Sequence, residues 1–379
     1  MKLHEFQAKQ ILSDFGLLAP ESGVAITPEQ AQEIARGLKA SRFVVKAQIH
    51  DHFRNKLTEE HFANSPVEVG KTARSLLGQA IAGNTPGAGD QAIKRVLVEA
   101  AVSAEHVFVL SLFVDPAAGG IMLSGYNRSD PAKSGAAGVL RLDLGTGHDF
   151  PEQDVEHLVA HLGVPDPQRE TFSALARGLV RAFVELDASQ IDIDPLAILP
   201  DGSLLALGAQ LTLDDNALVR QPALLALRCE DELEINAQHH QLNYVRLDGD
   251  IGLAANGAGL GLATLDMVRA ANGRPANFMD IRTTATSLDI AHGFGLILNN
   301  PNVRSLLVNV HGGGMQPCDT IAEGLGIAIR RTGRTLPTVV RLAGNNAAFA
   351  RTRFENFGCR IIDCPDMWSA AKQAVAAAR

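Results

Sequence analysis

The chain has 379 residues, of which 46% are hydrophobic and 20% are charged, which suits two or three globular domains and excludes a disordered protein. Its formal net charge of -8 argues against a broad nucleic-acid-binding surface, but it leaves room for a local basic pocket. The sequence contains no apolar run of membrane-spanning length, and its N-terminus lacks the apolar stretch of a secretory signal.

The four cysteines predict neither a disulfide framework nor a zinc site. None of them lies in the first 228 residues, and no pair has the CxxC spacing of a zinc site. They are Cys229, Cys318, Cys359 and Cys364. Reduced thiols of a cytoplasmic protein fit this pattern better.

The first half of the chain reads as a mixture of helices and strands. Apolar spacing predicts helices over residues 4–15 and 27–38, the second with Thr27 as N-cap before Pro28. Short apolar and β-branched runs predict strands over residues 42–49, 94–100, 106–114 and 119–125. This succession indicates a mostly antiparallel α+β unit.

Further along, helices are expected between residues 151 and 186 and a hairpin over residues 191–207. Pro200-Asp201-Gly202 is the turn signal of that hairpin, and residues 83–90 have the composition of a loop.

The second half alternates regularly between strands and helices. Five apolar strands, each followed by a helix, are predicted at residues 251–256, 278–281, 304–310, 338–344 and 359–363. Such alternation predicts a doubly wound parallel sheet of Rossmann-like or flavodoxin-like topology. We expect the domain boundary between residues 237 and 242, which gives domains of residues 1–238 and 239–379.

Two glycine clusters follow predicted strands of this second domain. Asn256-Gly257-Ala258-Gly259 comes after the first strand, and Gly312, Gly313 and Gly314 come after the third. Backbone amides at a helix N-terminus suit a carboxylate or a phosphate. The alternative is that both are merely tight strand-to-helix turns.

Three further groups of residues in the first half could each bind a ligand or could be ordinary surface residues. Lys46 could contact phosphate from a strand, or it could be a solvated lysine on the strand face. His50 and His52 share a face and could bind a metal, although a polar surface fits better. Asp192 and Asp194 could hold a cation or face solvent on an edge strand.

At these residues the sequence resembles the β subunit of succinyl-CoA synthetase, over nearly the whole chain and in order. The matching segments are LHEFQAKQIL, VVKAQIH, VLVEAA, IDIDPLAIL, DDNALVRQP, LNYVRLDGDIGLAANGAGL, PANFMDI, LLVNVHGG and VVRLAGNNA. The resemblance implies an N-terminal ATP-grasp domain and a C-terminal flavodoxin-like CoA-ligase domain.

The resemblance also implies a reaction that is shared between two kinds of subunit. An α-type partner would carry CoA and a histidine that ATP or GTP phosphorylates with Mg²⁺, so this chain itself would carry no catalytic residue. The phosphate would then pass to a small carboxylic acid, and CoA would attack the acyl phosphate. Lys46 matches a nucleotide-contacting lysine and Glu99 a residue near the base. Asn256 and Gly312–Gly314 match positions near the acid and the phosphohistidine.

The sequence departs from this family at the positions that handle the nucleotide. A glycine-rich loop is replaced by Asp51-His52-Phe53-Arg54-Asn55-Lys56-Leu57-Thr58-Glu59, in which Arg54 and Lys56 remain but every glycine is gone. Of the two magnesium ligands, an asparagine becomes Asp194 and an aspartate becomes Gly208. An acidic residue near the nucleotide becomes Val107.

A further departure lies in the second domain, where a GGGA loop that receives the phosphohistidine becomes Arg282-Thr283-Thr284-Ala285. A guanidinium there could bind a carboxylate or phosphate through two hydrogen bonds.

Three functions therefore remain open. The first is the β-type subunit of a hetero-oligomeric acid–CoA ligase with an altered acid or weakened nucleotide chemistry. The second is a non-catalytic subunit that regulates an α-type partner. The third is a protein that senses CoA or a carboxylate, or moves CoA between acids without a nucleotide.

Overall fold

The computed structural model describes residues 1–49, 60–81, 91–130, 138–146, 150–228, 232–313 and 316–379. The described residues form two compact units, one within residues 1–81 and 91–230 and the other within residues 231–379. The predicted boundary at 238/239 falls near the end of helix α7 (Glu232–His239), and it stays a prediction.

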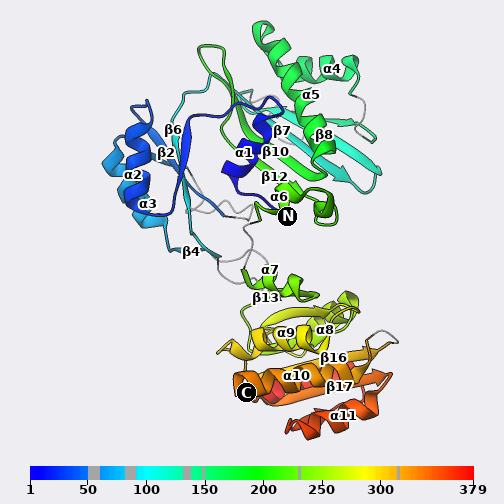
Figure 1. The fold of residues 1–379 in the computed structure, drawn as a ribbon. Coiled ribbons are helices and arrows are strands. Elements are labelled where there is room, and N and C mark those ends of the chain that lie inside the picture. Colours follow the sequence, from blue (N-terminus) through cyan, green and yellow to red (C-terminus); the bar gives the residue numbers. More distant parts are fainter. Residues whose placement is uncertain (50–59, 82–90, 131–137, 147–149, 229–231, 314–315) are drawn as a thin grey trace. The chain divides into compact units, whose positions relative to one another are not determined.

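The first sheet of unit 1 is antiparallel and carries two helices (Figure 1). Its strands, in spatial order, are β1 (Ser22–Ala25), β6 (Val96–Ala100), β2 (Phe43–Ala47) and β3 (His61–Ala63). The helices are α2 (Pro28–Gly37) and α3 (Pro66–Leu76), whose apolar residues share one buried cluster with the sheet. The predicted cap of α2 is confirmed, because the Thr27 hydroxyl accepts a hydrogen bond from the Gln30 amide at 3.2 Å.

The second sheet of unit 1 is also antiparallel and is built around a long strand, β10 (Ala188–Ile198). Around it lie β7 (His106–Asp115), β8 (Gly120–Asn127), β9 (Leu140–Asp143), β11 (Leu204–Ala206) and β12 (Ala209–Leu213). The predicted hairpin is confirmed, with Gly202 at a positive φ of 84° in its turn.

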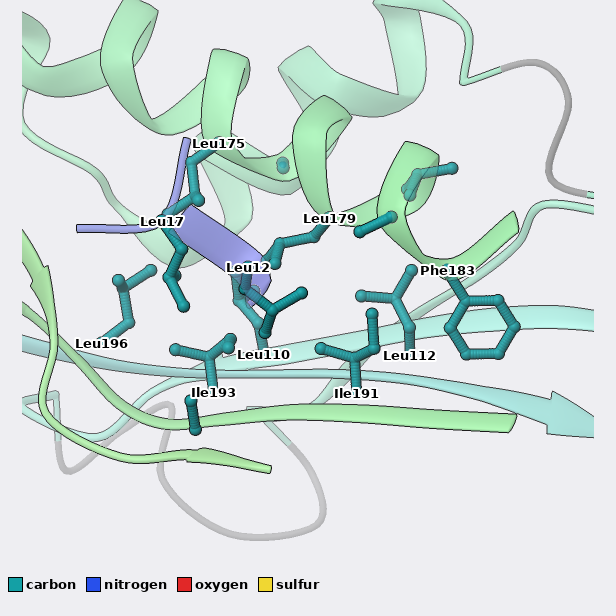
Figure 2. Packing of buried hydrophobic residues seen from close by; sticks show 14 of the residues in the cluster. Leu12, Leu17, Leu110, Leu112, Leu175, Leu179, Phe183, Ile191, Ile193 and Leu196 are labelled. Atoms are coloured by element: carbon teal, nitrogen blue, oxygen red, sulfur yellow. The ribbon is translucent and has the colours of Figure 1, made fainter. Parts of the chain in front are cut away.

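The core of this second sheet explains why the strands alternate in hydrophobicity (Figure 2). Leu110 and Leu112 of β7 and Ile191 and Ile193 of β10 point to the same face. Helices α1 (Glu5–Ser13), α4 (Glu152–Leu162) and α5 (Arg169–Glu185) supply the other side. From α5 come residues spaced by four, namely Leu175, Leu179 and Phe183. The helices predicted between residues 151 and 186 are thereby confirmed.

Unit 2 is a sheet with helices on both faces. In spatial order its strands are β13 (Leu242–Arg246), β15 (Asn277–Ile281), β14 (Ile251–Ala255), β16 (Ser305–Gly312), β17 (Thr338–Gly344) and β18 (Ile361–Asp363). From β14 onward the strands are parallel in chain order 2-1-3-4-5, the flavodoxin-like order. The prediction of a doubly wound parallel sheet is confirmed, but the antiparallel edge strand β13 was not predicted.

Two separate buried clusters cover the two faces of this sheet. Helices α9 (Ser287–Asn299), α10 (Cys318–Thr332) and α11 (Ala347–Asn356) pack on one face. Helices α8 (Ala258–Ala270) and α12 (Met367–Ala378) pack on the other. Each predicted strand is thus followed by the predicted helix, and the carboxyl ends of the parallel strands lie at one edge.

The remaining elements are short, and the thiols are enclosed. The short elements are β4 (Ala80–Ile81), β5 (Gln91–Ala92), α6 (Pro222–Leu225) and the 3-10 turns Asp166–Gln168 and Leu218–Arg220. Cys318, Cys359 and Cys364 are buried free thiols, and burial raises the pKa of Cys359 to about 11. No helix in the described ranges is long and apolar enough to cross a membrane.

Candidate functional site

Lys46 is buried within a cluster of opposite charges in unit 1. Its ammonium lies 2.8 Å from Glu99 Oε2, 3.1 Å from Glu5 Oε1 and 3.3 Å from Glu60 Oε1, and it donates to the Leu207 carbonyl at 2.5 Å. Lys46 is 7% exposed, so its interpretation as a solvated lysine on the strand face is wrong. Burial alone would lower its pKa, but the three carboxylates raise it above its usual range.

A second lysine, Lys9 of α1, completes this cluster. Its Nζ lies 2.6 Å from Glu99 Oε1 and 2.7 Å from Glu5 Oε1, and it donates to Leu207 O at 2.8 Å. Burial raises the pKa of Glu5, but the charges of Lys46 and Lys9 outweigh it and lower that pKa overall. The structure therefore brings together the predicted pair Lys46 and Glu99.

The two positions expected to hold magnesium do not fit that ion. A β-bulge between Ile193 and Leu196 of β10 contains Asp194. The Asp194 amide donates to the Gly208 carbonyl at 3.0 Å. A Cβ atom built on Gly208 would lie 2.1 Å from the Asp194 carbonyl oxygen, so only glycine fits there. Since magnesium takes several oxygen ligands in an octahedron, one carboxylate beside a bare backbone is a poor site for it.

A cation of the chain lies beside Asp194. The Arg128 guanidinium donates to Asp194 Oδ1 at 2.5 Å and to the Tyr126 hydroxyl at 3.3 Å. Burial would lower the pKa of Arg128, but the hydrogen bond to Tyr126 and the charge of Asp194 raise it. Within the described ranges, no three acidic, histidine or cysteine side chains are grouped as metal ligands.

Of the other candidate residues in the first half of the chain, Asp192 is hydrogen-bonded and several others lie outside the described residues. Asp192 accepts hydrogen bonds from Ser111 Oγ and, at 2.6 Å, from Gln190 Nε2. Its strand β10 pairs on both sides, so the interpretation of Asp192 and Asp194 as residues of an edge strand is wrong. The predicted candidates His50, His52, Arg54 and Lys56 lie outside the described residues.

In unit 2 the predicted glycine turns lie at the carboxyl edge of the sheet. The Asn256 side chain bridges to the neighbouring strand: its Nδ2 donates to His311 O at 2.8 Å and its Oδ1 accepts from His311 N at 2.9 Å. Gly257 has a φ of 107°, which favours glycine, and its amide donates to Asp280 Oδ1 at 2.7 Å. The turn after β14 is therefore joined to the last residues of β16 by hydrogen bonds.

Arg282 is exposed and is held at the same edge. Its Nε and one terminal nitrogen donate to Asn243 Oδ1 at 3.2 and 2.7 Å, and Asn243 Nδ2 donates to Asp280 Oδ2 at 2.9 Å. None of the described carboxylates forms an ion pair with Arg282. The order Arg282, Asn243, Asp280, Gly257 thus links three neighbouring strands.

Gly312 and Gly313 differ in their freedom. A Cβ atom on Gly312 would meet the Asn345 carbonyl at 2.5 Å and Cys318 Sγ at 2.8 Å, whereas one on Gly313 would meet nothing within 4 Å. The Gly312 carbonyl accepts from the Asn345 amide at 2.9 Å, which fixes the end of β16 against the end of β17. Gly314 lies outside the described residues.

Several residues of these two sites were not predicted. Glu5 and Lys9 are spaced i, i+4 on a helix, a signal that is available in the sequence. Asp280 ends a predicted strand, where ligands gather in such sheets. Asn243 belongs to the unpredicted strand β13, and no sequence pattern pointed to Arg128.

Family models and related proteins cover the chain almost completely. The ATP-grasp domain model matches residues 2–198 and the CoA-ligase model matches residues 254–375. A solved structure, ATP citrate lyase from Methanothrix soehngenii in complex with citrate and coenzyme A, aligns with a TM-score of 0.74 at 15% identity, covering 99% of both chains. At that identity the likeness shows the fold alone.

Two curated relatives are similar over their entire length. The β subunit of succinate–CoA ligase [ADP-forming] from Methylobacillus flagellatus is 36% identical and is covered completely, as is this chain. The corresponding subunit from Bacillus subtilis is 35% identical, with 99% of each chain covered. With an ATP-grasp domain followed by a CoA-ligase domain, the chain belongs to the family of succinate–CoA ligase β subunits.

Proposed function

We propose that this chain is the β-type subunit of a nucleoside-diphosphate-forming carboxylic acid–CoA ligase that works with an α-type partner. The observation that carries the proposal is the full-length similarity to subunits of that name at 36% identity. The α-type subunit would supply the CoA site and the phosphorylated histidine. This chain would supply the nucleotide site in unit 1 and part of the acid site in unit 2.

In this proposal the candidate nucleotide is ATP or GTP. Its site in unit 1 would support phosphoryl transfer only weakly. Lys46 and Glu99 support nucleotide binding because they lie together in one buried cluster. Gly208 and Arg128 argue against a magnesium ion at Asp194. Because Mg²⁺ neutralises the charge that develops on a transferring phosphoryl group, phosphorylation of the partner would be slow under this arrangement.

The acid site includes Asn256, Gly312, Gly313 and Arg282. Arg282 replaces a glycine of the family pattern and presents a guanidinium in which Asn243 orients two of the three nitrogens. A fork of this kind binds carboxylates through two parallel hydrogen bonds. An acid with more than one carboxylate is therefore the favoured substrate class.

Coexpression with the α-type subunit of the same organism tests this function. We expect the two chains to copurify and to form an acyl thioester from ATP, CoA and a small di- or tricarboxylic acid, slowly and without marked stimulation by Mg²⁺. Restoring the family residue, Arg282→Gly, should raise the KM for the acid, whereas Arg304→Gly at the far end of β16 serves as a control. Copurification without thioester from any acid would contradict the ligase.

A non-catalytic subunit is the second candidate, and the lack of space for a side chain at Gly208 favours it. Such a subunit would keep the surface that binds the α-type chain and would have lost phosphoryl transfer. The expected result is a stable complex that neither hydrolyses ATP nor phosphorylates the partner's histidine, measured by mass spectrometry. Phosphohistidine in the complex would exclude this candidate.

A further inference from the structure

Arg128 occupies the part of unit 1 where the family pattern places acidic metal-side residues. Its backbone amide donates to the Val107 carbonyl at 2.8 Å, and Val107 stands at a position that is acidic in that pattern. Its side chain pairs with Asp194, which stands at a magnesium-ligand position. Of the two expected magnesium-ligand positions, one holds a carboxylate and the other a glycine, and the arginine pairs with that carboxylate.

We propose that Arg128 takes the place of the divalent cation beside Asp194, so that this chain binds a nucleoside triphosphate that carries no metal ion. The proposal deepens the proposed function, because it rests on the nucleotide as ligand of unit 1. A guanidinium cannot lose its charge at physiological pH and repels a second cation, most strongly a divalent one. The carboxylate that would hold the metal is already paired with a positive charge.

The guanidinium has donors left for an anion. Both of its side-chain hydrogen bonds, to Asp194 and to Tyr126, leave from one terminal nitrogen. Within the described part of the chain, Nε and the other terminal nitrogen donate to no acceptor. These N–H groups point to different sides of the planar guanidinium, so each of the two nitrogens can donate to a separate oxygen of an anion.

The backbone connects Arg128 with the buried lysine of the same unit. Lys46 donates to the Leu207 carbonyl at 2.5 Å, and the Leu207 amide donates to the Pro195 carbonyl at 2.8 Å. Pro195 follows Asp194 directly in the β10 bulge. Backbone hydrogen bonding therefore joins Leu207, which Lys46 contacts, to Pro195, the neighbour of the residue with which Arg128 pairs.

The test compares ATP binding by the full-length chain in EDTA and in Mg²⁺, by calorimetry. We expect the wild-type chain to bind ATP with the same Kd, within about twofold, in both conditions. Arg128→Ala should weaken binding in EDTA at least about tenfold, the loss expected for charge-assisted hydrogen bonds. Arg128→Lys, which keeps the charge but not the fork, should fall in between.

Arg177→Ala is the matched control. Arg177 pairs with Glu152 elsewhere in unit 1, and its side chain is 38% exposed against 36% for Arg128. The substitution Arg177→Ala removes the same charge as Arg128→Ala and should leave the Kd for ATP unchanged in both EDTA and Mg²⁺. A second probe is Mn²⁺ alone, whose uptake is read by electron paramagnetic resonance, and we expect none at Asp194.

Three results that do not involve a change of Arg128 would overturn the proposal. They are tighter ATP binding in Mg²⁺ by tenfold or more, Mn²⁺ uptake that Asp194→Asn abolishes, and no ATP binding in either condition. The last result leaves the ligase partnership to be judged separately by copurification and thioester formation. Unchanged ATP binding by Arg128→Ala in EDTA would equally refute a role for that side chain.

Discussion

The two candidate sites are held together by different forces. In unit 1, Lys9, Lys46, Glu5 and Glu99 form a buried network in which each member is charged. In unit 2, the site is held mainly by glycine turns and neutral amides, and Asp280 is a buried acceptor between Gly257 and Asn243. A charged network depends on every partner being present, whereas a glycine turn depends on the absence of a side chain.

This difference indicates which substitutions each site can tolerate. The acid side keeps the glycines of the family pattern at 312 and 313, and at Gly312 the meeting of the strand ends leaves no room for a side chain. The nucleotide side keeps its buried charges but departs from the family pattern at the half-buried positions around Asp194.

Removing one member of the buried network should give the largest effect. Glu99→Gln keeps the volume of the side chain but leaves the ammonium groups of Lys9 and Lys46 with less compensation. We expect the free energy of unfolding of unit 1 to fall by about 3–5 kcal/mol, measured by urea titration. Glu33→Gln, which breaks the exposed pair with Arg36, should cost about 1 kcal/mol or less.

The same network predicts a dependence on pH. The pKa of Glu5 is lowered in the folded chain, so its contribution is present above its unfolded pKa of about 4.3 and is lost as pH falls through the folded value. In Glu5→Gln the wild-type loss of stability below that pH should become smaller. Equal acid sensitivity of both proteins would show that Glu5 does not carry it.

A methyl group at the end of β16 should give the next largest effect. In Gly312→Ala the new Cβ meets the Asn345 carbonyl and Cys318 Sγ, so the strand ends must separate. We expect a loss of about 1–3 kcal/mol in the stability of unit 2. Gly313→Ala is the matched control, because its Cβ points into open space. Similar losses in both variants would mean that the close approach of β16 and β17 is unimportant.

The elements of unit 2 were predictable because local and global signals agree there. Apolar strands of β-branched residues alternate with helices of period 3.6, and each of the five pairs exists in the structure. The antiparallel strand β13 escaped because its polar residues Asn243 and Arg246 leave only Tyr244 and Val245 as a short apolar run.

The electrostatics of unit 1 were not predictable in the same way. Lys46 is buried because carboxylates from α1, β6 and residue 60 reach it, and these come from distant parts of the sequence. The pair of Arg128 and Asp194 depends on a bulge whose position only the register of β10 on β7 defines. Sequence spacing describes faces of elements, and these contacts form between elements.

A smaller effect is expected from the amide bridge between β14 and β16. Asn256→Ala removes both hydrogen bonds to the His311 backbone, which leaves those groups to water because the site is partly exposed. We expect a loss of about 1–2 kcal/mol, measured by urea unfolding of unit 2. Asn302→Ala, at an exposed asparagine of the same unit, should change stability by less than about 0.5 kcal/mol. Equal losses of stability in the two variants would mean that the hydrogen bonds of Asn256 to His311 do not stabilise unit 2.

The smallest effect should come from a histidine pair that neither site uses. The rings of His240 and His292 stack with centroids 4.0 Å apart, and His240 Nδ1 lies 3.0 Å from Asp289. Burial lowers the pKa of His292, as do the charges of His240 and Arg331, while Asp289 opposes them.

The lowered pKa sets the sign of this last prediction. Neutral His292 is favoured in the folded chain, so its contribution is full above its unfolded pKa of about 6.5 and is lost as pH falls below that value. In His292→Phe, which keeps the stacked ring, the slope of unfolding free energy between about pH 7 and 5 should decrease by less than one bound proton. An unaltered slope in His292→Phe would mean that other ionisable groups of unit 2 carry its acid sensitivity.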